Sequence, residues 1–91
     1  MVVSTLAYVE HYLAERYLSP RSGIFLAEDV ARVQAVAAGR ARLLQTLYVP
    51  DDEICFYLFE SESAALVEEA TSDAGIELTR VMRCAVGGLA N

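Results

Sequence analysis

The sequence predicts an α+β fold in which strands and helices follow one another in the order β-α-β-β-α-β. Three observations support this prediction. Residues 53 to 60 form a strand-length apolar run between two carboxylates, rich in residues that favour strands. Two longer segments, one on each side of the middle pair of strands, space their apolar residues as helices do and end near a glycine. Proline and aspartate at 50 to 52 form a short turn, which joins the middle strands as a hairpin.

The first half of the chain contains one strand and one helix. The first strand is predicted at residues 11 to 18, and it ends at the turn residues Ser19-Pro20 and Ser22-Gly23. The helix that follows has acidic residues in its early turns, and Gly39 suits its C-terminal cap. Its apolar positions at helical spacing are Leu26, Val30, Val33 and Ala37.

The second half contains three strands and one helix. The strands are predicted at residues 41 to 49, 53 to 60 and 76 to 84. Ser61 and Ser63 are alternative N-caps of the second helix, which ends at Gly75. The predicted organisation is an N-terminal extension, one domain and a flexible C-terminal tail, at residues 1–10, 11–84 and 85–91 respectively.

This order of elements is the split β-α-β, or ferredoxin-like, arrangement. It predicts a four-stranded antiparallel sheet in the order 4-1-3-2, with both helices on one face. The central strand is apolar on both faces, which carry Ile54, Phe56 and Leu58 on one side and Cys55, Tyr57 and Phe59 on the other. Because the helices cover only one face, we expect a second copy of the chain or a ligand to cover the other, and we predict a homodimer.

Composition and charge exclude several classes of protein. The 91 residues are 55% hydrophobic, which excludes a disordered chain, and the net charge of −6 argues against a surface that follows nucleic-acid phosphates. The longest apolar run is far short of a membrane span. Two cysteines do not make a disulfide framework, and the N-terminus lacks the pattern of a secretory signal. We therefore expect a cytoplasmic protein without nucleic-acid or membrane partners.

Several segments of the chain match those of a known family. They are Glu-Arg-Tyr-Leu-Ser-Pro at 15–20, Tyr-Val-Pro-Asp-Asp-Glu at 48–53, Cys-Phe-Tyr-Leu-Phe-Glu at 55–60, Ala-Gly at 74–75 and Arg-Val at 80–81. Through them the chain resembles a family of small ferredoxin-like proteins, common in actinobacteria and named after a nickel-responsive member. The resemblance implies the fold and the dimer, and it raises nickel as a ligand. Where the nickel-binding member has histidines, this chain has Thr71 and Ile76.

The first and last strands are neighbours in this topology, so a cross-strand register can be predicted. Residue numbers across an antiparallel ladder have a constant sum. One register pairs, on a single face, Glu15 with Arg80, Leu13 with Met82, Tyr17 with Leu78 and His11 with Cys84. An interior carboxylate needs a partner, and Arg80 supplies one for Glu15. This pair is either a structural ion pair beneath a dimer contact or the anchor of a polar ligand.

Tyrosines extend the candidate ligand site. The chain has five tyrosines and no tryptophan, and a phenol donates a hydrogen bond inside an apolar cleft. Most of these tyrosines suit packing and interface roles. The predicted ligand-binding residues are Glu15, Tyr17, Tyr57 and Arg80.

A second candidate site combines the histidine with the two cysteines. His11 begins the first strand and Cys84 ends the last. Cys55 begins the central strand, which we expect to run parallel to the first, so we expect all three residues at one end of the sheet. Imidazole and thiolate are ligands for nickel or zinc. The alternative is that all three are packing residues.

The sequence has no strong catalytic signature, which favours a binding or accessory protein that responds to a ligand or a metal. The alternative is an enzyme related to small dimeric α+β barrels that act on aromatic or polyketide-like molecules, with Glu15 or His11 as general base. A third role is that of a regulatory or assembly subunit. An enclosed apolar pocket that reaches Glu15 or His11 would favour the enzyme.

Overall fold

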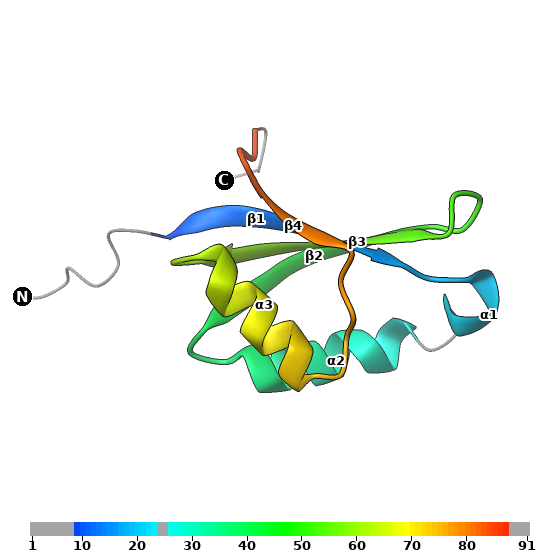
Figure 1. Cartoon of the computed structure of the whole chain (residues 1–91), viewed down its shortest axis with the longest axis horizontal. Coiled ribbons are helices and arrows are strands. Elements are labelled where there is room, and N and C mark those ends of the chain that lie inside the picture. The colour runs from blue at the N-terminus through cyan, green and yellow to red at the C-terminus, as the bar shows by residue number, and fades with distance from the viewer. Residues whose placement is uncertain (1–8, 24–25, 88–91) are drawn as a thin grey trace, which may run out of the picture.

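A computed structural model gives the fold of the chain and describes residues 9–23 and 26–87. The predictions for residues 1–8 and 88–91 lie outside this range. The described chain consists of four strands and three helices (Figure 1). In chain order they are β1 (Glu10–Tyr17), α1 (Pro20–Gly23), α2 (Leu26–Ala37), β2 (Ala41–Val49), β3 (Ile54–Ser61), α3 (Ala64–Asp73) and β4 (Arg80–Cys84).

The four strands form one antiparallel sheet in the order β2-β3-β1-β4. This is the predicted order, read from the opposite edge. The predicted register is confirmed at its centre, because β1 and β4 pair Glu15 with Arg80, and it holds for the Leu13–Met82 and His11–Cys84 pairs. Strand β2 has one additional residue between Leu43 and Gln45, which forms a β-bulge opposite β3. The two strands pair regularly on both sides of this bulge.

The core lies between the sheet and the two longer helices, which pack on the same face of the sheet (Figure 1). Alternation along β3 decides which side chains enter it. Cys55, Tyr57 and Phe59 are fully buried on the helix side. Val33 of α2 and Val67 of α3 meet them there, and both are fully buried as well. The centre of the helix side of the sheet is therefore filled by apolar side chains.

Local hydrogen bonds set the ends of α3. Of the two serines predicted as N-caps, Ser63 takes this role, and its hydroxyl accepts a hydrogen bond of 3.2 Å from the Leu66 N–H. At the other end Gly75 adopts a φ of 78°, the left-handed region that glycine enters without strain. The Ile76 N–H donates to the Thr71 carbonyl oxygen at 2.9 Å, which completes the C-terminal cap.

Two predicted elements differ from the structure. The segment after β1, predicted as a turn, contains the short helix α1, so the prediction of two helices is short by one. Its proline is at the first helical position, and the Ser22 N–H donates to the Ser19 hydroxyl. The last strand begins at Arg80 rather than at residue 76, because residues 76–79 must first cross from the helix layer to the sheet. Leu78 therefore does not pair with Tyr17.

No helix within residues 9–23 and 26–87 combines the length and the apolar character needed to cross a bilayer.

The left-handed backbone of Gly75 gives a test of the α3 cap. We expect Gly75→Ala to lower the free energy of unfolding by about 1 kcal/mol, since a Cβ is strained in this conformation. Gly87→Ala is the matched control, because an added Cβ there also meets no neighbour but the backbone is not left-handed. Urea unfolding of the two variants measures the difference. Equal stabilities would contradict the assigned cap.

Candidate functional site

The sheet face that points away from α2 and α3 is apolar, and we call it the open face. The cross-strand register shows which side chains share it. Leu47 is 54% exposed on this face and Tyr17 is 65% exposed. The apolar side chains of the open face are Leu13, Leu47, Val49, Ile54, Phe56, Leu58 and Met82.

An ion pair marks one edge of the open face. The Arg80 Nε donates to the Glu15 Oε1 at 2.9 Å, with the carboxylate more buried than the guanidinium. The predicted partnership of these two residues is therefore present. The Glu15 carboxylate lies next to Phe56 of β3 and is held by Arg80, so its charge is compensated inside the apolar face.

The other predicted ligand residues separate onto different faces. Tyr17 shares the open face with Glu15, and its hydroxyl donates to the Glu53 carboxylate, which raises the pKa of Tyr17. Tyr57 pairs with Ala14 instead and is fully buried on the helix side. The sheet thus separates Tyr57 from the predicted ligand site, because neighbouring residues of a strand point to opposite faces.

The three residues predicted to bind a metal do not lie together. His11 and Cys84 are direct cross-strand partners on the open face, as predicted, and Glu60 flanks His11 from β3 with the Nε2 and Oε2 atoms 4.0 Å apart. Cys55, however, pairs with Arg16 at the far end of the sheet. Its predicted position was wrong because β1 and β3 are antiparallel, so the start of β3 meets the end of β1. Both cysteines are free thiols.

In the part of the chain that the structure describes, no group of three or more His, Cys, Asp or Glu side chains is placed to hold a metal ion. A trio of His11, Cys55 and Cys84 is therefore not brought together.

An ionic network centred on the buried carboxylate of Asp29 lies on the helix side of the sheet, and the sequence pattern did not predict it. Asp29 of α2 accepts from Arg16 of β1 (Nη1 to Oδ2, 3.0 Å) and from Arg32 (Nη2 to Oδ1, 2.6 Å). The Arg32 Nε also donates to the Ala74 carbonyl oxygen at the end of α3, at 2.9 Å. One carboxylate thus connects the sheet with both helices.

The neutral neighbours of this network leave it with a positive charge. Burial raises the pKa of Tyr57 to about 12 and raises the pKa of the Cys55 thiol, so both are uncharged at neutral pH. Burial alone lowers the pKa of Arg16, but its hydrogen bonds to Tyr57 and Asp29 outweigh this and the pKa is raised. Two guanidinium groups share one carboxylate, and the sum is one excess positive charge.

The sequence carried a weak signal for this network. Arg16 stands between Glu15 and Tyr17 in a strand whose alternation places it on the helix side. A charged residue at such a position needs a partner from the covering helices. The acidic residues of α2 were interpreted only as favourable charges near a helix N-terminus, although Asp29 is also at core spacing with Val33 and Ala37.

Comparison with known proteins identifies the fold and no activity. No family model and no curated protein matches the chain. The crystal structure of SCO4226 from Streptomyces coelicolor A3(2) superposes with a TM-score of 0.77, and the alignment covers 86% of this chain and 99% of that one. The identity is 16%, so the similarity is one of fold.

The Asp29 network predicts a specific loss of stability. Asp29→Asn leaves Arg16 without its counter-charge in a site where the carboxylate is only 11% exposed, and we expect a loss of about 2 kcal/mol. Asp73→Asn is the matched control, since this carboxylate also binds an arginine, Arg40, but is 56% exposed and solvent-screened. For the control we expect less than about 1 kcal/mol. Urea unfolding compares the two, and similar losses would contradict the burial of the Asp29 carboxylate.

The raised pKa of Tyr57 predicts that this phenol loses its proton at a higher pH than an ordinary tyrosine. A folded-state pKa of about 12, against the ordinary 10.0, favours the protonated phenol in the folded chain. This contribution to stability is full below pH 10 and is lost as the pH rises toward 12. Tyrosinate absorbance should therefore show a component near pH 12 that Tyr57→Phe removes and Tyr17→Phe retains. A component that persists in Tyr57→Phe would refute the assignment.

Proposed function

We propose that this chain is a small homodimeric binding protein in which the open faces of two copies pack against each other. The observation that supports the proposal is the apolar character of the open face, with Leu47 more than half exposed beside Phe56 and Val49. Exposed patches of this kind are typical of interfaces. The proposal takes the fold as ferredoxin-like, which the sheet order and the two longer helices support.

The size of the open face suits a second copy of the chain. The four strands have eight, nine, eight and five residues, and at about 3.4 Å per residue and about 4.8 Å between strands they give a projected area of about 500 Å². The solvent-accessible area of the open face is larger than this projected area, because its side chains protrude from the sheet. Stable dimers use about 800 Å² from each partner, so a dimer needs the whole face, and a small ligand would leave most of it exposed.

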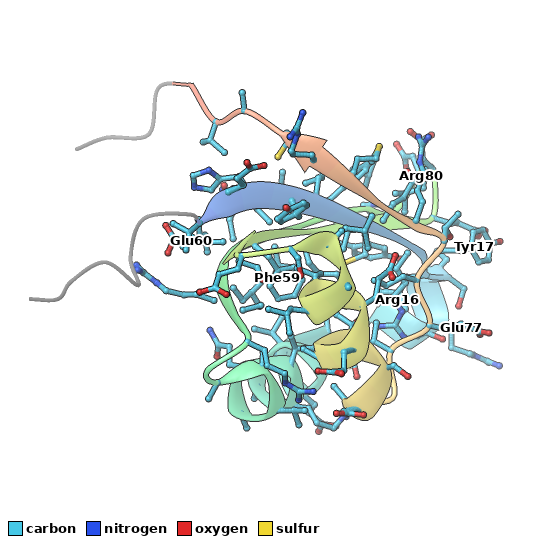
Figure 2. The ribbon with its side chains drawn as sticks, turned by 60° about the vertical axis from the view of Figure 1, so that its left-hand side comes forward. Arg16, Tyr17, Phe59, Glu60, Glu77 and Arg80 are labelled. Carbon is cyan, nitrogen blue, oxygen red and sulfur yellow. The ribbon has the colours of Figure 1, made fainter. Side chains whose placement is uncertain are left out.

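The charges around the open face also suit a second copy. At one end Glu15 binds Arg80, and at the other Arg42 approaches Glu60 at 3.5 Å. Each end therefore carries both signs. A two-fold axis brings the same surface from both copies together, so the ion pairs of one copy can meet charges of opposite sign on the other. Figure 2 shows Arg80 and Glu60 at opposite ends of the molecule.

A binding role is better supported than an enzymatic one. Glu15, the proposed general base, is held in an ion pair with Arg80, and His11 lies in an open depression with Glu10, Arg83 and Cys84. Nickel responsiveness has less support, since the described residues gather no metal-binding trio. Cytoplasmic location, which the sequence predicts, forms part of the proposal.

Leu47→Glu tests the dimer. In a two-fold interface the substitution occurs twice, each time losing about 2 kcal/mol of apolar burial and placing a charge in the contact. We expect the dimer dissociation constant to rise about 100-fold or more in sedimentation equilibrium. Gln34→Glu, which adds the same side chain on the exposed side of α2, is the matched control and should leave it unchanged.

Two results would overturn the proposal. One is a wild-type chain that remains monomeric at millimolar concentration. The other is a Leu47→Glu variant that dimerises as tightly as the Gln34→Glu control while both keep the wild-type circular dichroism spectrum.

A further inference from the structure

A cavity of about 340 Å³ lies at the end of the sheet where β1 finishes and the segment before β4 arrives. Arg16 is its most buried charged residue, with a side chain that is 17% exposed. Figure 2 shows Arg16, Tyr17 and Glu77 together at this end of the molecule. The lining residues are Arg16, Tyr17, Glu77, Leu78 and Thr79.

Toward residues 9–23 and 26–87, the Arg16 guanidinium uses one of its nitrogens. The Nη1 donates to both Asp29 and Tyr57, at 3.0 Å each. Among residues 9–23 and 26–87, Nε and Nη2 make no hydrogen bond, and no buried side-chain nitrogen or oxygen lacks a partner. The Nε and Nη2 atoms therefore have no hydrogen-bond partner among the described residues. This edge of a guanidinium presents two parallel N–H donors at the spacing of two oxygens of one anion.

Other donors lie around the same cavity. The Thr79 side chain supplies a hydroxyl, and the backbone N–H groups of Glu77 and Leu78 make no hydrogen bond with any described residue. The excess positive charge of the Asp29 network lies behind Arg16. Glu77 opposes an anion, but it is exposed and its charge is screened by solvent, whereas that of Arg16 is largely buried.

From these observations we infer that the cavity is a binding site for the oxyanion group of a small molecule, a carboxylate or a phosphate, held by the Nε and Nη2 edge of Arg16. Leu78 gives the remainder of such a molecule an apolar surface. The inference rests on the proposed binding role and names its ligand class. It does not depend on the dimer, because one copy of the chain supplies all the lining residues.

Nuclear magnetic resonance titration with benzoate, and with the uncharged benzamide of the same shape, tests the site at constant ionic strength. We expect benzoate to shift the Arg16 Nε–H and Thr79 amide signals in a saturable way, and benzamide to bind at least about tenfold more weakly. A second titration uses inorganic phosphate in place of benzoate. Tighter binding of benzoate assigns the site to carboxylates, and tighter binding of phosphate assigns it to phosphorylated molecules.

Three substitutions test which side chains bind the anion. Arg16→Lys keeps the charge beside Asp29 but loses the paired donors, and we expect about tenfold weaker binding of the preferred oxyanion. Arg42→Lys is the matched control at an arginine that is 75% exposed, and it should not change the affinity. Glu77→Gln removes the opposing charge and should strengthen binding about twofold.

The wild-type titration remains decisive if Arg16→Lys does not fold. Equal binding of benzamide, saturable shifts that map away from the cavity, or no saturable shift with either anion would overturn the site. Sedimentation equilibrium on the same sample reports the dimer separately, so a failure of oxyanion binding is distinguished from a failure of dimerisation.

Discussion

The structure depends on the shared carboxylate of Asp29. Through Arg16 this carboxylate holds the end of β1, and through Arg32 it reaches the carbonyl oxygen that ends α3. A buried carboxylate is costly unless its oxygens accept hydrogen bonds, and here each Asp29 oxygen accepts from a guanidinium group. The contact fixes how the helix layer lies on the sheet, and it positions the guanidinium edge that we assign to an anion.

Alternation along the strands gives the two sheet faces different roles. The helix side is filled by Tyr57, Phe59 and Val33, all fully buried, and encloses the ionic network. The open face carries side chains of similar size with no covering element from the described chain. The central strand is thus apolar on both faces for two different reasons. One face packs in the core, and the other packs against the proposed partner. The inferred oxyanion cavity lies at the end of the sheet, at the edge of the helix layer.

The charge of the protein makes the position of Arg16 informative. The chain has a net charge of −6, so it repels anions on average. An anion site in such a protein requires a local excess of positive charge shielded from the surrounding carboxylates. The Asp29 network supplies this excess, because burial keeps the neighbouring phenol and thiol neutral.

Local sequence pattern and simple pairing rules were enough to predict several features of the fold. Residues 41–49 were predicted with the observed bounds of β2, and the sheet order and the Glu15–Arg80 pair followed from the element order and the constant sum of an antiparallel ladder. Other features depend on how the elements pack against one another. Cys55 lies opposite Arg16 because β3 runs antiparallel to β1, and β4 starts at Arg80 because the chain must first leave the helix layer. The Arg16–Asp29 contact joins residues on different elements whose partnership depends on how a helix lies across a sheet, and neither residue's local sequence contains that information.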